Sequence, residues 1–290
     1  MTTTAPSSTF DFEHAQDGVV TVWLNSDGAV VVLNRDLVAT LAATMDTIAA
    51  LDPTGLIIAS ACDRAWIAGA DLGEINTLGD DDLAQYLADG AAALGKIADV
   101  GCPTVAAIDG ATLGGGLELA LHCDGLVIST ASRRKRPYPI GLPEASLGLC
   151  PGWGGTQTLP TRIQPADAIL AAATGETFMS DALPEGLADI TVETAEDVID
   201  AARSWILSAP SPIEAPQCIG PDNASDIAQS LTEITEQLPD TDAARAVAEA
   251  TRAGIEGGWG SGLAAEQRLL ITLRHTNTAK ERIEAFLARG

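Results

Sequence analysis

Short apolar runs alternate with helix-like segments through the first half of the chain. Residues 19–24 and 29–33 are rich in strand-forming side chains and flank the turn sequence Asn-Ser-Asp-Gly at 25–28, which predicts a β-hairpin. Residues 36–51 carry apolar side chains at helical spacing behind a potential cap, Asp36. Further strands are predicted at 55–60, 104–108 and 126–128, and further helices at 80–98 and directly after the glycines at 114–116. This alternation predicts an α/β fold with mostly parallel strands.

Helical patterns dominate the second half of the chain, where strand signals become rare. The predicted helices are 166–173, 195–207, 243–256, 263–273 and 278–287. Four prolines between 208 and 226 indicate a linker. We therefore divide the chain into a disordered polar lead (1–14), an α/β core (15–207), a linker (208–226) and a C-terminal helical extension (227–290).

Composition and charge narrow the functional classes. Apolar residues make up 46% of the chain and charged residues 19%, as in ordinary globular proteins, and no run reaches the ~18 apolar residues of a membrane span. The net charge of −24 opposes binding to nucleic acid and to anionic membranes. The five cysteines are odd in number and form no Cys-x-x-Cys pair, which favours reduced thiols in a cytoplasmic protein over a disulfide or metal framework. No metal site and no nucleic acid partner are expected.

The strongest chemical signal is the glycine run 114–116 at the start of a predicted helix. Without Cβ atoms, the first turn of this helix lets a ligand oxygen approach peptide N–H groups that have no acceptor within the helix. The helix dipole favours an oxygen that becomes negative. Glu118 follows within one turn, so the pattern indicates an oxyanion hole beside an acid–base group.

Three glycine-marked segments follow predicted strands, where α/β folds bind their ligands. They are 67–71, 110–118 and 141–157. Singly, each has an ordinary explanation, because a glycine triplet often serves tight packing of a helix on a strand. A lone glutamate in a loop is usually a solvated charge or a helix cap. The order and content of the three segments together are more informative.

Together the segments resemble those of the crotonase superfamily of enoyl-CoA hydratases and isomerases. The motifs are Ala-Gly-Ala-Asp at 68–71, Gly-Gly-Gly-Leu-Glu-Leu-Ala-Leu at 114–121, and the long glycine-rich segment 141–157. The residues inserted at 132–137 are similar to the hydratase part of multifunctional fatty-acid oxidation subunits. The resemblance implies a spiral of ββα units with a helical C-terminal extension.

The resemblance also implies roles for individual residues. The amides of Ala70 and Gly115 would hold the thioester oxygen, with Glu118 as the base and Glu144 as the acid beside the α,β-double bond. A shared apolar site is expected to keep one of the two carboxyl groups protonated near neutral pH. The expected substrate-binding neighbours are Ala68, Gly69, Asp71, Gly114, Gly116, Pro143 and Trp153.

Two glutamates favour hydration of an enoyl-CoA, because isomerases of the superfamily commonly keep only the second one. Isomerisation is the alternative, and a catalytically silent protein that kept the fold is a second alternative. The family chemistry requires no cofactor beyond the coenzyme A of the substrate. The resemblance further implies a homotrimer or hexamer, and the product suits a separate 3-hydroxyacyl-CoA dehydrogenase.

The basic run Arg133, Arg134, Lys135 and Arg136 stands out in so acidic a chain. It is either a solvated loop or a dock for the CoA phosphates, with Lys280 and Arg282 as the next candidates. His122 lies four residues after Glu118, on the same helix face, and we interpret it as a packing residue.

Overall fold

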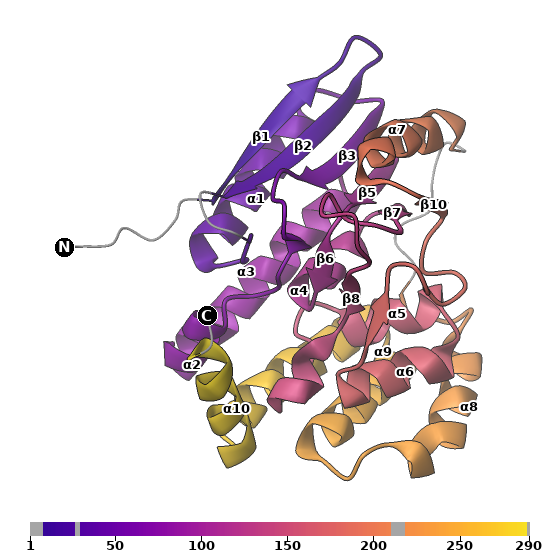
Figure 1. The fold of residues 1–290 in the computed structure, drawn as a ribbon. Coiled ribbons are helices and arrows are strands. Elements are labelled where there is room, and N and C mark those ends of the chain that lie inside the picture. Colours follow the sequence, from indigo (N-terminus) through magenta and orange to yellow (C-terminus); the bar gives the residue numbers. More distant parts are fainter. Residues whose placement is uncertain (1–7, 27–29, 210–217, 289–290) are drawn as a thin grey trace, which may run out of the picture.

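Two β-sheets form the centre of the molecule in the computed structural model, which describes residues 8–26, 30–209 and 218–288 (Figure 1). The larger sheet has six strands in the order β1-β2-β3-β5-β7-β10, and all pairs except β1–β2 are parallel. The smaller sheet has the order β4-β6-β8-β9, with only β8–β9 antiparallel. The predicted α/β class and the mostly parallel pairing are thus confirmed.

The strands are short and the helices vary widely in length. The strands are β1 (Ser8–His14), β2 (Val19–Ser26), β3 (Gly55–Ser60), β4 (Ala65–Ile67), β5 (Thr104–Ile108), β6 (Ala111–Leu113), β7 (Gly125–Ser129), β8 (Pro139–Gly141), β9 (Thr177–Met179) and β10 (Ile190–Val192). The helices are α1 (Arg35–Ala49), α2 (Leu72–Thr77), α3 (Asp80–Ala98), α4 (Gly115–Ala120), α5 (Gly155–Arg162), α6 (Pro165–Thr174), α7 (Val198–Ser208), α8 (Ala224–Ile234), α9 (Asp242–Leu273) and α10 (Asn277–Leu287). Short 3-10 turns are η1 (Pro143–Leu147), η2 (Ala195–Asp197) and η3 (Thr235–Gln237).

Alternate residues of the central strands face two different hydrophobic cores. In β3, Leu56 and Ile58 belong to the large core, whereas Ile57 lies in a smaller core under α7. This follows from the two-residue period of a strand, and a strand buried on both faces reads as a continuous apolar run. Both faces of the central strands of the larger sheet are therefore covered.

The predicted hairpin pairing of 19–24 with 29–33 is wrong, and residues 27–29 of its turn lie outside the described residues. β2 pairs instead with β1 before it, through a turn at 15–18 in which Gly18 has φ 84°. The segment 31–33 pairs with the loop 68–71: the Leu33 N–H donates to the Gly69 oxygen at 2.9 Å, and the Ala68 N–H donates to the Val31 oxygen at 2.8 Å. These long-range bonds hold the loop where the sequence predicts half of the oxyanion hole.

The predicted disordered lead 1–14 is also wrong over residues 8–14, which form strand β1; residues 1–7 lie outside the described residues. Its phenylalanines, Phe10 and Phe12, alternate with polar residues and therefore share one face of the strand. Asp36 is not the cap of α1, because Asn34 fills that place and accepts from the Leu37 N–H at 2.8 Å. The cap lies two residues earlier than predicted.

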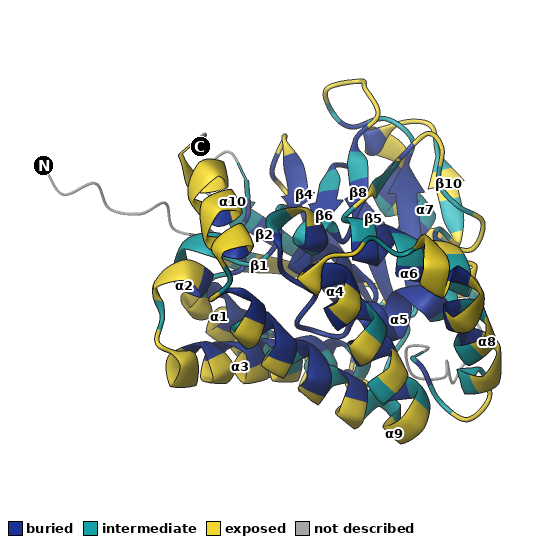
Figure 2. Ribbon diagram, turned by 90° about the horizontal axis from the view of Figure 1, so that it is seen from below, coloured by how far each residue is buried: buried dark blue, intermediate teal, exposed yellow. Residues whose placement is uncertain are grey.

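The C-terminal helices pack directly on the core. α9 lies along α3, α5 and α6, and Figure 2 shows exposed residues along the outer faces of α3 and α9 and around much of α10. α9 joins the two helices predicted at 243–256 and 263–273 across a kink at Gly258, where φ is 71°. Of the predicted linker, 210–217 lie outside the described residues, and α8 begins at Ala224, inside its predicted range. None of the described helices is both long and apolar enough to cross a membrane.

Arg274, just after α9, ties the C-terminal helices to the core. Its guanidinium is buried and donates to the carbonyl oxygens of Ile75 at 2.8 Å and Leu78 at 2.7 Å, and it pairs with Asp80.

Arg274→Ala leaves buried acceptors unpaired, so we expect the free energy of unfolding in urea to fall by about 1–3 kcal/mol. Arg268→Ala removes an exposed arginine paired with Glu249 and should cost less than about 1 kcal/mol. Equal losses in both variants would contradict this role of Arg274.

Candidate active site

The first component of the site is the loop 68–71. The Leu33 N–H donates to the Gly69 oxygen, and the Asp71 N–H donates to the Leu33 oxygen. Ala70 lies between these two bonds, and its own N–H takes no part in the parallel bridge. The Asp71 carboxylate accepts from the N–H groups of Gly73 at 2.7 Å and Glu74 at 3.1 Å and so begins α2. The loop is fixed on both sides, while the Ala70 amide has no acceptor among the described residues and can bind a ligand.

The glycine triplet brings a second amide next to that of Ala70. Gly115 is the first residue of α4, so its N–H has no acceptor within the helix. A Cβ on Gly115 would overlap the Trp153 ring and would lie 3.4 Å from the Ala70 nitrogen. A Cβ on Gly114 would come within 2.7 Å of Glu144 Oε1, and one on Gly116 within 2.7 Å of the Ile67 oxygen. Only glycines let the two amides and the carboxylate approach this closely.

Glu118 projects from the first turn of α4 and is buried, with 2% of its surface exposed. Its Oε1 accepts from the N–H groups of Trp153 and Gly155, both at 2.8 Å. Burial raises the pKa of Glu118, and the negative charges of Glu266 and Glu144 raise it further, while the two N–H donors oppose that shift. The carboxylate is therefore held in place by the backbone and is strongly sensitive to neighbouring charge.

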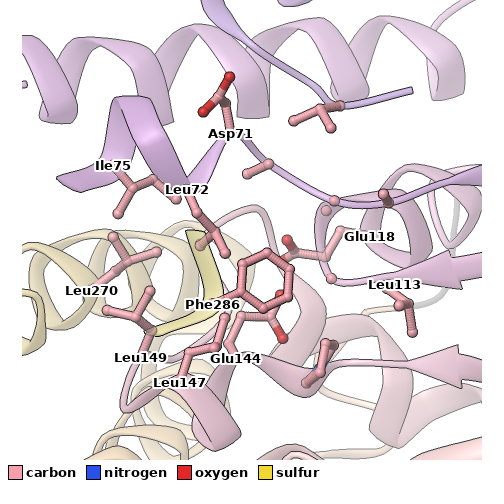
Figure 3. Close-up of a pocket in the computed structure, with 18 of the residues that line it drawn as sticks. Asp71, Leu72, Ile75, Leu113, Glu118, Glu144, Leu147, Leu149, Leu270 and Phe286 are labelled. Carbon is pink, nitrogen blue, oxygen red and sulfur yellow. The ribbon is translucent and has the colours of Figure 1, made fainter. Parts of the chain in front are cut away.

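Glu144 approaches the same space from η1 (Figure 3). Its Oε2 is buried, and within the described part of the chain it has no hydrogen-bond partner. Burial raises the pKa of Glu144 to about 8. Glu144 therefore keeps a proton near neutral pH and can donate it to a ligand.

A cavity of about 700 Å³ joins these groups. Its walls are mainly apolar, and Figure 3 shows Glu118 and Glu144 among leucine, isoleucine and phenylalanine side chains from α2, α9, α10 and the region around η1. Arg64 is an exposed cation at its edge. The predicted site residues that line it are Ala68, Gly69, Ala70, Asp71, Gly114, Gly115, Glu118, Pro143, Glu144 and Trp153. Such a cavity suits a long, mostly apolar ligand with one polar reacting group.

Trp153 closes one side of the cavity. Its ring stacks edge-on against Tyr86 with centroids 5.5 Å apart, and its Nε1 donates to the Leu87 oxygen at 3.1 Å. A Cβ on Gly90 of α3 would overlap the same ring, so Trp153 fills the space between α3 and the oxyanion glycine Gly115. The indole thus forms a rigid wall near the reacting groups.

The basic run is not among the described residues that line the cavity. Arg133 pairs with the buried carboxylate of Asp109 at 2.7 Å and donates to the Ser60 and Ala61 oxygens at 2.7 and 3.1 Å. Arg133 is therefore committed to structural contacts. Gly116 also lies outside the lining residues and packs on Ile67.

Sequence reasoning missed several contributors to the site, above all Glu266 and Arg64. Glu266 is fully buried on α9, where its neighbours Ala265, Leu269 and Leu270 are apolar and buried. A charged residue on the apolar face of a helix is a signal that could have drawn attention to it. Arg64 sits four residues before the Ala68 motif and carries no distinctive local pattern.

Known proteins agree with this geometry. A model of the enoyl-CoA hydratase/isomerase family matches residues 14–215. A probable enoyl-CoA hydratase of Rhizobium meliloti is 30% identical over 276 residues, which are 94% of this chain and 93% of that protein. The chain therefore belongs to the enoyl-CoA hydratase/isomerase family, within the crotonase superfamily, and the resemblance found in the sequence is confirmed.

Solved structures extend the agreement in fold to nearly the whole chain. The human mitochondrial delta3-delta2-enoyl-CoA isomerase has a TM-score of 0.66 at 22% identity, covering 99% of this chain and 98% of that one. A carnitinyl-CoA dehydratase from Mycobacterium thermoresistibile has a TM-score of 0.69 at 21% identity, covering 96% of this chain and 89% of that one. The fold is the crotonase fold, and neighbours of this fold differ in the reactions their names describe.

The raised pKa values predict that stability falls as pH rises through neutrality. A glutamate ordinarily titrates at 4.5, whereas burial holds the pKa of Glu144 at about 8 and that of Glu266 at about 7. Between about pH 4.5 and about pH 8, these glutamates bind more protons in the folded protein than in the unfolded chain. The free energy of unfolding therefore declines as pH rises through this range. Glu144→Gln removes one such titration and should make the decline shallower in urea unfolding series. The exposed control Glu185→Gln should leave the slope unchanged, and equal slopes for wild type and Glu144→Gln would contradict the assignment.

Proposed function

We propose that this protein is an enoyl-CoA hydratase that adds water to trans-2-enoyl-CoA and forms 3-hydroxyacyl-CoA. The observation that carries the proposal is that the buried Glu118 and Glu144, whose Oε2 is buried, share one cavity with the amides of Ala70 and Gly115. A single acid–base group would suffice to move one proton between carbons. Addition of water requires a base for the water and an acid for the neighbouring carbon.

In the proposed reaction, the amides of Ala70 and Gly115 bind the thioester oxygen and stabilise it as negative charge develops. Glu118 takes a proton from water while the water oxygen bonds to Cβ of the enoyl group. Glu144 gives its proton to Cα, which converts the enolate to the product. Both carboxyl groups regain their starting states by proton exchange with solvent.

The hydrogen bonds support this division of labour between the two glutamates. Glu118 Oε1 accepts two peptide N–H groups, which act against the rise in the pKa of Glu118 caused by burial and leave the other oxygen for water. Glu144 has an unpartnered buried oxygen and a pKa of about 8, which favours the protonated form. A neutral Glu144 also eases the ionisation of Glu118, since two adjacent carboxylates disfavour each other.

Incubation with crotonyl-CoA and with longer enoyl-CoAs, followed by loss of the conjugated thioester absorbance, tests the proposal. We expect Glu118→Gln and Glu144→Gln each to lower kcat by about 10²–10⁴-fold, because glutamine keeps the shape but transfers no proton. The exposed variant Glu185→Gln is the matched control and should retain full activity. If Glu118→Gln kept its activity on a 3-enoyl-CoA while Glu144→Gln lost it, the isomerase alternative would replace hydration. No turnover of either substrate would favour a silent binding protein.

The position of the CoA phosphates is a second point of the proposal. The basic run at 133–136 was one candidate, but Arg133 is occupied by Asp109, and Arg64 is the cation at the cavity edge. We expect Arg64→Ser to raise KM for enoyl-CoA several-fold with little change in kcat, because ground-state and transition-state binding weaken alike. The joint replacement of Arg134, Lys135 and Arg136 by Ser is the comparison. A rise in KM for this triple variant alone would return the phosphate dock to the basic run.

The proposal includes the remaining expectations from the sequence. No cofactor beyond the coenzyme A of the substrate takes part, and a separate 3-hydroxyacyl-CoA dehydrogenase would consume the product. The large exposed side chains Phe286 and Leu287 of α10 line the cavity, so a homotrimer or hexamer would give them a covering neighbour. All five cysteines are unpaired, in keeping with the proposed cytoplasmic location.

A further inference from the structure

A buried carboxylate that is not among the residues lining the cavity binds the same backbone segment as Glu118. Glu266 comes from the middle of α9 and is fully buried. Its Oε2 accepts from the Gly154 N–H at 2.7 Å, and its Oε1 accepts from the Thr156 N–H at 2.8 Å and the Thr156 hydroxyl at 2.5 Å. The proposed hydration reaction has no role for this group, yet its burial demands compensation by three donors.

The donors of Glu266 alternate with those of Glu118 along one short segment. Residues 153 and 155 donate their N–H groups to Glu118 Oε1, and residues 154 and 156 donate theirs to Glu266. Four successive peptide N–H groups are thus shared between a carboxylate of α4 and a carboxylate of α9. The two carboxylates hold the segment from its two sides.

The segment cannot hold this shape by itself. It leads into α5, so its N–H groups precede the first acceptors inside that helix. Gly154 has φ 103°, in the left-handed region, and a Cβ there would overlap the Trp259 ring of α9. α9 therefore contacts the segment twice, through Trp259 and through Glu266. Anionic groups at this end of α5 are also favoured by the helix dipole.

We propose that Glu266 is a positioning residue for catalysis, which holds the segment 153–156 so that its amides fix the Glu118 carboxylate beside the substrate. The proposal rests on the hydratase function proposed above and names a residue on which the base of that reaction depends. Glu266 touches no substrate and acts through Glu118. Its charge has a second effect, since an ionised Glu266 disfavours ionisation of Glu118 more than Glu144 does.

Other ionisable groups near the carboxylates stay in one state at ordinary pH. Burial raises the pKa of the Tyr86 hydroxyl from α3 and of the Cys150 thiol, and burial lowers the pKa of His122, which follows α4. Arg268 of α9 is exposed and paired with Glu249. Among the described residues near the segment, burial raises the pKa of Glu144 to about 8 and that of Glu266 to about 7, and it raises the pKa of Glu118 as well.

Glu266→Gln tests the proposal, because it keeps the side-chain shape and removes the charge. We expect kcat for enoyl-CoA hydration to fall by about 10–100-fold with KM within about twofold, since the loss concerns the placement of the base. The acid limb of the pH–rate profile should move to lower pH by about half a unit or more, because Glu118 loses a neighbouring negative charge.

Two control variants separate positioning from mere support of the fold. Leu269→Ala empties a buried site on the same helix and lowers Tm, but it should not move the pH profile. Glu249→Gln makes the same substitution at an exposed site of α9 and should change neither Tm nor the pH–rate profile. If Glu266→Gln behaved like Leu269→Ala, with a lower Tm and an unmoved acid limb, Glu266 would be a structural cap of α5 and the proposal would be overturned.

A measurement without turnover distinguishes failure of this inference from failure of the proposed function. The titration of Glu118 can be followed by carboxyl ¹³C NMR, with its signal assigned by its loss in Glu118→Gln. A lower midpoint in Glu266→Gln supports the inference even if wild-type protein hydrates no enoyl-CoA, whereas an unmoved midpoint in an active enzyme overturns the inference alone. If Glu266→Gln does not fold, Thr156→Val provides the second variant. It removes one donor from the Glu266 anion, so less of Glu266 is ionised and the midpoint of Glu118 should move in the same direction.

Discussion

Buried negative charge needs hydrogen-bond donors, and in this protein that need brings three distant parts of the chain together. Glu118 of α4 and Glu266 of α9 are both buried, and the start of α5 supplies amides to each. None of the three parts can shift without leaving a carboxylate or an amide unpaired in the interior. The cavity and the C-terminal helices are therefore structurally coupled, although the sequence pattern suggests that these helices form a separate extension.

Close approach of backbone to backbone is the second constraint on the site. The amide of Ala70 belongs to a loop held by Leu33, and the amide of Gly115 belongs to the start of α4. The two amides can approach each other because the residues of α4 that contact the Trp153 ring and the Ile67 backbone are glycines, which have no side chain. An oxyanion hole made of peptide groups costs no reorganisation during the reaction, and here it is built by packing rather than by flexible side chains.

The charge of the cavity follows from the same packing. A protein of net charge −24 is proposed to bind a ligand with several phosphates and to stabilise a developing enolate. Burial favours a proton on Glu144, and this proton removes negative charge from the place where the enolate forms. Arg64 places positive charge at the cavity edge, while Arg133 is held away from it by Asp109. The local arrangement of charge thus differs from the average charge of the surface.

The sequence by itself determined the α/β class, through its alternating patterns, and the candidate catalytic set, through glycines and glutamates that are close neighbours along the chain. Glu118 lies two residues from the triplet, so local spacing alone relates it to an oxyanion hole. Only the tertiary structure decided that 31–33 pairs with the loop 68–71, that Arg133 serves Asp109, and that Glu266 reaches Thr156, 110 residues away. These choices depend on which polar groups become buried together, and burial is a property of the whole packed chain that no local pattern encodes.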